Sequence, residues 1–259
     1  MQVQPHPGQY ANINGLQLYY EIHGDGYPLI LIHGGGSTIE STYGRILPEL
    51  AKKYRIIAVE LQAHGRTKDI DRPLTFEQDA DDVAALCAQL KINKAHFMGF
   101  SNGGTTCLQI AIRHPNLVNK LILASSIFKR QGMQPGFFEG MDHASLDQMP
   151  QPLKDAFLKV NLDRNGLLAM FRRDVARMVS FRDIPDPAIH GIQAPAFVLN
   201  GDKDVVRSAH AMELAQLLPH AQLAILPSGH GDYIGESCTP TPESNLPNLV
   251  VEMIDSFLK

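Results

Sequence analysis

The sequence predicts an α/β protein in which helices cover both faces of a mostly parallel, eight-stranded sheet. Apolar runs of strand length alternate with amphipathic segments of helix length along the 259 residues. Continuous apolar runs such as residues 28–32 are typical of strands buried on both faces, and strand–helix alternation is typical of parallel sheets. The alternation stops between residues 127 and 187 and then resumes. We therefore expect a core of residues 1–126 and 188–259, with a helical cap inserted at residues 127–187.

The expected core elements follow one another in a regular order. A hairpin joins the first two strands through Asn14 and Gly15, because both residues tolerate the positive φ of a two-residue turn. The strands are expected at residues 10–12, 16–22, 28–32, 55–61, 95–98, 118–124, 195–199 and 221–226. Core helices are expected around residues 46–50, at 75–90 with Thr75 as N-cap, and at 105–114, 209–218 and 249–258.

The predicted cap has an unusual apolar composition. It holds six of the 11 phenylalanines and five of the 9 methionines, and helices are expected at residues 152–160 and 167–179. Flexible methionine side chains suit varied apolar ligands. We expect most of these side chains to pack the cap onto the core and a few to face a substrate.

Composition excludes several classes of partner. The formal net charge is -4 and no run is rich in Lys or Arg, so we expect no nucleic acid partner. No apolar stretch approaches the roughly 18 residues of a membrane span. The first five residues show no basic-then-apolar leader, and the three cysteines have no paired spacing. We therefore expect a cytoplasmic protein without a disulfide framework; nothing here indicates an oligomeric state.

Residues 99–103 form a G-x-S-x-G motif between an expected strand and an expected helix. A strand that turns at once into a helix holds Ser101 in a strained conformation and raises its hydroxyl above the sheet edge. The helix N-terminus then directs free N–H groups toward it. The structural alternative is that the glycines only connect strand and helix, with Ser101 as an N-cap.

A histidine and several carboxylates follow other strands at the same sheet edge. His230 comes after the last strand, and Asp202 and Asp204 come after the strand before it. A serine nucleophile needs a base within hydrogen-bond reach and an acid behind that base. We expect His230 to be the base and Asp204 the acid, with Asp202 capping a turn. Asp232 is a rival for the acid.

Four further side chains are weighed against this arrangement. Glu60 ends a strand and is another rival acid. His33 is expected to be structural because it ends a strand and precedes the glycine loop. His64 and His96 are expected to be structural because neither has an identifiable catalytic partner.

The oxyanion formed by serine attack needs donors that are already in position. The backbone N–H of Asn102 is one expected donor. Gly35 is the expected second, because glycine lets the backbone approach a substrate closely, and Gly36 is its alternative. The structural alternative is that residues 34–36 form only a flexible turn.

From the first hairpin to the last helix, the chain resembles the α/β-hydrolase superfamily, in its cap-bearing, esterase-like serine hydrolase branch. The motifs that carry the resemblance stand at residues 33–36, 65–67, 99–104, 201–204 and 229–230. In that family the acid matches the second aspartate of a Gly-Asp-x-Asp stretch, here Asp204. One departure is Glu60, where relatives often have Asp.

The resemblance implies a small-molecule substrate and no cofactor or metal. The expected reaction is hydrolysis of a small or medium carboxylic ester, thioester or lactone through an acyl-enzyme on Ser101. A carbon–carbon bond hydrolase of the same fold stays open, because that class shares the serine and the glycine-rich loop. A non-catalytic small-molecule binding protein on the same fold also stays open.

Two other enzyme classes fit the sequence poorly. A dinucleotide-binding G-x-G-x-x-G motif starting at Gly34 fails, because Ile39 occupies the position of its last glycine. A metal hydrolase would need an H-E-x-x-H motif or paired Cys/His spacing, which the sequence lacks.

Residues 231–248 are irregular, and we expect a surface excursion there rather than a loop that lines the entrance to the site.

Overall fold

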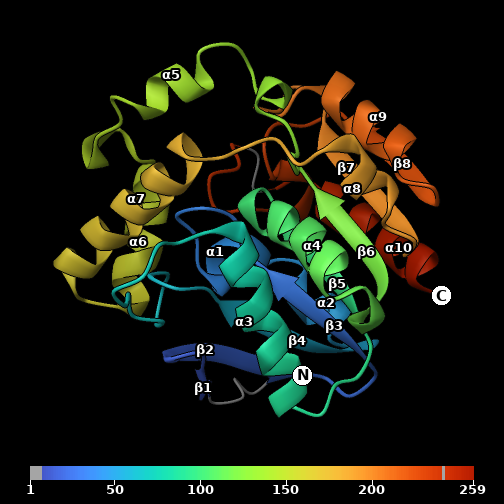
Figure 1. The fold of residues 1–259 in the computed structure, drawn as a ribbon, viewed down its shortest axis with the longest axis horizontal. Coiled ribbons are helices and arrows are strands. Elements are labelled where there is room, and N and C mark those ends of the chain that lie inside the picture. The colour runs from blue at the N-terminus through green and yellow to red at the C-terminus, as the bar shows by residue number, and fades with distance from the viewer. Residues whose placement is uncertain (1–7, 241–242) are drawn as a thin grey trace.

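The computed structural model describes residues 8–240 and 243–259, and within them the strands form one eight-stranded sheet (Figure 1). The strands are β1 (Gln9–Ile13), β2 (Leu16–His23), β3 (Tyr27–Ile32), β4 (Tyr54–Glu60), β5 (Ala95–Phe100), β6 (Val118–Ala124), β7 (Ala196–Gly201) and β8 (Ala221–Leu226). Their order in the sheet is β1-β2-β4-β3-β5-β6-β7-β8. Strand β2 is antiparallel to β1 and β4, and the other neighbours are parallel. The predicted sheet is confirmed.

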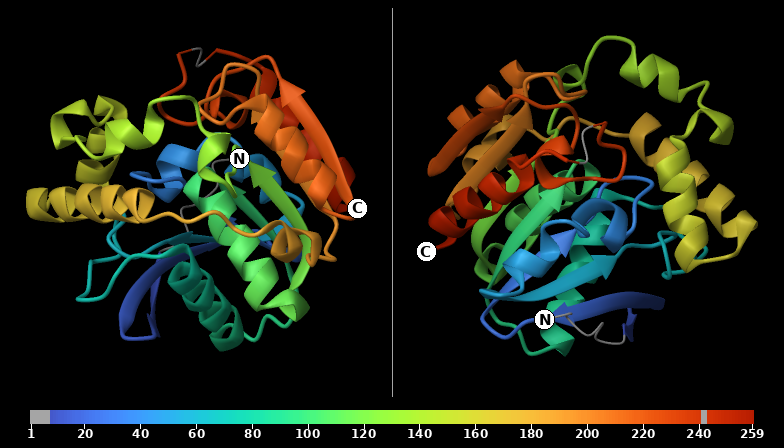
Figure 2. Two further views of the ribbon diagram at one scale, coloured as in Figure 1. Left: turned by 45° about the horizontal axis from the view of Figure 1, so that its top comes forward. Right: turned by 180° about the vertical axis from the view of Figure 1, so that it is seen from behind.

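Helices cover both faces of this sheet, as views from opposite sides show (Figures 1 and 2). The α-helices are α1 (Ile39–Tyr43), α2 (Leu47–Leu50), α3 (Phe76–Gln89), α4 (Asn102–Arg113), α5 (Phe137–Met141), α6 (Gln151–Val160), α7 (Arg164–Val179), α8 (Asp186–His190), α9 (Ser208–Leu217) and α10 (Leu246–Leu258). Short 3-10 helices are η1 (Pro115–Leu117), η2 (Arg130–Gly132), η3 (Leu146–Gln148) and η4 (Asp232–Ile234).

Two hydrophobic cores lie on opposite faces of the sheet. Buried side chains of α3, α4, α8 and α9 form one core with the strands, and those of α1, α2 and α10 form the other. Side chains alternate along a strand, so Ile30 and Ile32 of β3 enter the first core while Leu29 and Leu31 enter the second. This explains why β3 reads as a continuous apolar run in the sequence.

Local signals that predicted element ends are confirmed. Asn14 and Gly15 form the β1–β2 turn with φ values of 49° and 82°. The Thr75 hydroxyl accepts a hydrogen bond of 3.1 Å from the Gln78 N–H at the start of α3. Strand β7 runs two residues past its predicted end at residue 199, because its last residues still pair with β8.

The chain between β6 and β7 carries helices α5, α6 and α7, which lie to one side of the sheet and its covering helices (Figure 2). The helices predicted at residues 152–160 and 167–179 correspond to α6 and α7. Helix α8, next along the chain, instead belongs to the core that contains α3 and α4. The division into a core and a cap domain at residues 127 and 187 stays a prediction.

Residues 231–236 turn inward, and the predicted surface excursion is wrong for this part of the chain. Tyr233 and Ile234 are 0% exposed and Glu236 is 4% exposed. Gly231 and Gly235 adopt φ values of 82° and 74°, which allow the tight turn of η4 that buries these side chains. Residues 241 and 242, part of the same predicted excursion, lie outside the described residues.

In the described ranges, none of the helices has the length and apolar character that crossing a membrane requires. Cys87, Cys107 and Cys238 are all free thiols, and the first two are buried in the core.

Candidate active site

Ser101 stands at the junction of β5 and α4 with φ 53° and ψ -120°. This backbone region is costly for a residue with a side chain, and such strain is concentrated at functional sites. The neighbouring glycines make the junction sterically feasible. A Cβ on Gly99 would lie 2.1 Å from the Gly103 carbonyl oxygen, and one on Gly103 would lie 2.1 Å from that of Ile32. Only glycine fits at either position, as the motif predicts.

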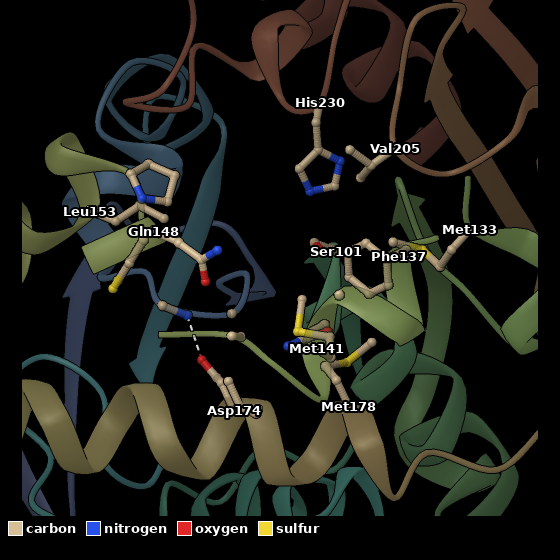
Figure 3. A pocket seen from close by; sticks show the side chains of 18 of the residues that line it. Ser101, Met133, Phe137, Met141, Gln148, Leu153, Asp174, Met178, Val205 and His230 are labelled. Carbon is tan, nitrogen blue, oxygen red and sulfur yellow. Dashed lines mark hydrogen bonds between the residues drawn. The ribbon is translucent and has the colours of Figure 1, made fainter. Parts of the chain in front are cut away.

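Ser101 lines a cavity of about 550 Å³ between the sheet edge and helices α5 to α7 (Figure 3). Most of the wall is apolar, with side chains from Ile127, Met133, Phe137, Met141, Met149, Leu153, Phe171, Val175, Met178, Val205 and Val206. Six of the 11 Phe and Met residues between positions 127 and 187 therefore border the cavity, more than the few that the sequence indicates. The polar groups of the wall include Ser125, Gln148, Asp174 and His230.

His230 and Asp204 form a hydrogen-bonded pair at this cavity. His230 Nδ1 lies 2.7 Å from Asp204 Oδ1, and Asp204 is only 3% exposed. The carboxylate also accepts hydrogen bonds from the Val206 N–H at 2.9 Å and the Ser125 hydroxyl at 2.5 Å. Burial alone would raise the pKa of Asp204, but its bonds to His230 and Ser125 hold that pKa below its ordinary value. An ionised Asp204 requires a proton on His230 Nδ1, which leaves Nε2 for chemistry.

The His230 ring enters the same cavity as Ser101 (Figure 3). Both residues lie in the described part of the chain, and in this structure the Ser101 hydroxyl and the imidazole do not hydrogen-bond each other. In free enzymes such catalytic hydrogen bonds are often long and tighten only when substrate binds. The structure therefore places a serine, a histidine and an aspartate at one cavity, in the chain order Ser…Asp…His that the sequence predicts.

The rival carboxylates are engaged elsewhere. Asp202 accepts a hydrogen bond of 2.9 Å from the Ser228 N–H, which is the turn-capping contact that the sequence predicts. Asp232 accepts one of 2.8 Å from the Gly229 N–H. Glu60 pairs with Arg66, through its N–H at 2.6 Å and its guanidinium at 2.8 Å. These contacts shape loops around the cavity.

His33 and His96 are packed into the fold. His33 Nδ1 donates to its neighbouring Gly34 carbonyl at 2.7 Å, and Nε2 accepts from the Leu61 N–H at 3.1 Å. Burial lowers the pKa of His33 to about 3 and that of His96 to about 4. Both rings are therefore neutral near pH 7, in agreement with the structural interpretation.

His64 has a partner that the sequence did not indicate, Asp174 of helix α7. Its Nδ1 lies 2.8 Å from the Gln62 carbonyl oxygen and its Nε2 lies 2.9 Å from Asp174 Oδ2. A carbonyl and a carboxylate both accept hydrogen bonds, so these two short contacts favour donation by both ring nitrogens and a charged imidazole, although the Gly36 N–H also lies 3.3 Å from Nε2. Burial would lower the pKa of His64, but the Asp174 carboxylate outweighs it and keeps that pKa above its ordinary value.

Asn102 and Gly35, whose backbone N–H groups are the two predicted oxyanion donors, contact each other at the cavity that Ser101 lines. A Cβ on Gly35 would lie 2.5 Å from the side-chain Nδ2 of Asn102, and both residues border the cavity. The Asn102 N–H belongs to the first turn of α4, where a helix leaves N–H groups without intrahelical partners. The alternative donor, the Gly36 N–H, already donates to Asp174 Oδ2 at 2.6 Å. This contact favours Gly35 over Gly36.

Sequence reasoning missed Ser125 and Asp174. Ser125 follows β6 at the same sheet edge as the other candidates, and its hydroxyl also contacts the Tyr233 hydroxyl at 2.7 Å. Its position after a strand was therefore a usable signal. Asp174 carried no such signal, because its partners outside its own helix lie 110 and 138 positions away in the chain.

Within residues 8–240 and 243–259, no group of three or more His, Cys, Asp or Glu side chains is arranged to hold a metal ion.

Known proteins resemble this chain along most of its length. A family model described as alpha/beta hydrolase fold matches residues 27–157. Serine hydrolase BPHL of Homo sapiens is 26% identical over 230 residues, covering 84% of this chain and 77% of the relative. The 2-hydroxymuconate semialdehyde hydrolase of Pseudomonas sp. (strain CF600) is 29% identical over 232 residues, covering 86% and 77%. The crystal structure of the enol-lactonase from Burkholderia xenovorans LB400 superposes with a TM-score of 0.73 at 24% identity, covering 96% and 99%.

Proposed function

The chain belongs to the α/β-hydrolase fold family and is a hydrolase, and from this premise we propose that it cleaves a small or medium, uncharged carboxylic ester, thioester or lactone through an acyl-enzyme on Ser101. The observation that carries the proposal is the 2.7 Å contact between His230 Nδ1 and Asp204 Oδ1 at the cavity that Ser101 lines. An acid behind a histidine is what a serine nucleophile requires.

The proposed reaction proceeds in two acyl-transfer steps. His230 Nε2 takes the proton of Ser101 Oγ as that oxygen attacks the substrate carbonyl carbon, and Asp204 stabilises the resulting imidazolium. The imidazolium then protonates the leaving alcohol, thiol or ring oxygen, and the acyl group stays on Ser101. His230 next deprotonates a water molecule that attacks the acyl-enzyme, and the carboxylic acid leaves.

The negative oxygen of each tetrahedral intermediate would be held by the N–H groups of Asn102 and Gly35. Donors that are already oriented stabilise developing charge without reorganising, and each is worth about 10²–10³ in kcat. The occupied Gly36 amide supports Gly35 as the second donor.

The charge of the cavity supports an uncharged substrate. Among the described residues that line it, Asp174 is the one carboxylate, His230 is the one histidine, and no lysine or arginine is present. A substrate carboxylate bound there would lose its water without gaining a cation, at a cost of several kcal/mol. A neutral acyl chain loses nothing in the same place and gains apolar contacts.

A second candidate is carbon–carbon bond hydrolysis. It is favoured by the 29% identical relative, whose substrate is named as a muconate semialdehyde and so is a carboxylate. The same serine and glycine loop would serve that reaction. The absence of lysine and arginine from the described cavity wall weighs against it.

Two esters of matched length separate these possibilities. We expect p-nitrophenyl hexanoate to be hydrolysed with a kcat/KM at least about 50-fold above that of the mono-p-nitrophenyl ester of adipic acid, because the second ends in a carboxylate. Release of p-nitrophenol gives both rates, and 2-hydroxymuconate semialdehyde is assayed in parallel by its absorbance.

The Ser101→Ala variant is the control for background hydrolysis in each assay. Equal rates on the two esters would contradict the uncharged-substrate proposal. Turnover of the muconate semialdehyde that exceeds turnover of every ester would favour the carbon–carbon bond hydrolase.

A further inference from the structure

Helix α7 brings a carboxylate from the cap side of the cavity to the glycine loop beside Ser101 (Figure 3). Asp174 Oδ2 accepts hydrogen bonds from the Gly36 N–H at 2.6 Å and from His64 Nε2 at 2.9 Å. Its other oxygen, Oδ1, accepts one from the guanidinium of Arg177, one helical turn further on. Three donors from three segments of the chain therefore hold one carboxylate in a single orientation.

The charges around Asp174 are balanced. Its partners His64 and Arg177 are both cations, and Arg177 also donates to Asp79 Oδ2 at 2.7 Å. Arg177 is 3% exposed, so this ion-pair network lies inside the protein. A lone carboxylate at this place would oppose the negative oxygen of a tetrahedral intermediate nearby. The two cations remove that opposition while leaving Asp174 free to accept a backbone hydrogen bond.

We propose that Asp174 is a positioning residue of the oxyanion hole. By accepting the Gly36 N–H it sets the orientation of the peptide groups at residues 34–36 and leaves the Gly35 N–H for the oxyanion. The inference rests on the proposed acyl transfer at Ser101. Because Asp174 belongs to α7, the oxyanion hole is complete only when this helix is seated against the glycine loop, which couples the cap to catalysis.

A second ion pair on helix α7 provides a control that distinguishes positioning of the oxyanion hole from simple docking of the helix. Arg173, the residue before Asp174, places its Nε 2.8 Å from Asp69 Oδ2 and one Nη 3.1 Å from the Ile70 carbonyl oxygen. This contact also joins α7 to the core, but it does not involve the glycine loop or the cavity wall. Loss of the Arg173 contact therefore measures docking alone.

The test compares Asp174→Ala, Asp174→Asn and Arg173→Leu with the wild type on p-nitrophenyl hexanoate. We expect Asp174→Ala to lower kcat about 10- to 100-fold while KM changes less than about threefold, because the oxyanion donor is misplaced but the acyl cavity remains. Asp174→Asn keeps an acceptor oxygen for Gly36 and should recover part of the lost kcat. Arg173→Leu should keep both constants within about threefold of the wild type.

Amide hydrogen exchange of the peptide that contains residues 33–37 gives an independent measurement. The Gly36 N–H should exchange faster in Asp174→Ala than in Arg173→Leu. If the alanine variant does not fold, the kcat of Asp174→Asn is compared with that of Arg173→Leu instead, and a lower kcat is expected for Asp174→Asn. A loss confined to KM, or equal losses for Asp174→Ala and Arg173→Leu, would overturn the positioning role alone. A wild type that hydrolyses no ester would overturn the proposed function and the positioning role with it.

Discussion

Asp202 and Asp204 stand two positions apart but have different environments. The difference identifies Asp202 as a residue that stabilises a turn and Asp204 as the candidate catalytic acid. Asp202 is exposed and holds the Ser228 N–H, whereas Asp204 is buried against His230, Ser125 and the Val206 N–H. The depressed pKa of Asp204 keeps it ionised and fixes the tautomer of His230. The sequence alone favoured Asp204 only through position and resemblance, and the hydrogen bonds now supply a physical reason.

At this scale the matched pair Asp204→Asn and Asp202→Asn tests the acid. We expect Asp204→Asn to lower kcat about 10⁴-fold, because an asparagine that donates to the ring favours the wrong tautomer. Asp202→Asn keeps an acceptor for the Ser228 N–H and should lower kcat less than about tenfold. Ester hydrolysis at saturating substrate measures both, and similar losses in the two variants would speak against Asp204 as the acid.

Whether a site residue could be predicted from the sequence depended on where it lies in the fold. Ser101, Asp204 and His230 each follow a strand, so their shared sheet edge could be inferred from the order of the elements. Asp174 lies inside a helix, away from any strand end, and its role depends on contacts across 138 positions. The inward turn of residues 231–236 was missed because burial of Tyr233 depends on a tertiary contact with Ser125.

At the scale of elements, helix α7 is joined to the loops and helices that surround the sheet through buried charge. Its Asp174 and Arg177 connect to the glycine loop, to His64 after β4, and to Asp79 on α3. Buried ion pairs contribute chiefly when every charge keeps its partner. The seating of α7 should therefore depend on the protonation of His64.

That dependence predicts how stability changes with pH. The pKa of His64 is raised in the folded state, so its contribution is fully present below about 6.5 and is lost as the pH rises through the raised value. The pKa of Asp174 is lowered, so its own contribution is lost only in acid. The difference in Tm between wild type and Asp174→Asn should be largest near pH 6.5 and shrink as the pH rises through the raised pKa of His64.

The pKa values of neighbouring groups define the pH range in which the Tm difference reports on His64. Burial raises the pKa of Asp79 to about 6 and lowers that of His33 to about 3, so neither changes charge appreciably above about pH 7.5. The control is Asp69→Asn, which breaks the ion pair between Asp69 and Arg173 of α7 without involving a histidine. Its Tm difference should stay constant over this range, and a constant difference for Asp174→Asn as well would contradict the charged His64.

At the scale of the whole molecule, the fold class was predictable because it depends on patterns that repeat. Apolar runs buried on both faces give parallel strands, and their alternation with helices gives a sheet with two covered faces. The cavity was less predictable. Its apolar wall and its lack of lysine and arginine among the described residues emerge only when α5, α6 and α7 are placed over the sheet edge.

The central claim is that the serine at the β5–α4 junction becomes covalently acylated during turnover. Incubation with a fluorophosphonate, followed by intact-mass analysis and peptide mapping, tests it most directly. We expect one adduct per chain on the peptide that contains Ser101, and no adduct on a folded Ser101→Ala variant, whose ester turnover should fall about 10⁶-fold. An adduct on a different residue, or a Ser101→Ala variant that keeps its esterase activity, would contradict the claim.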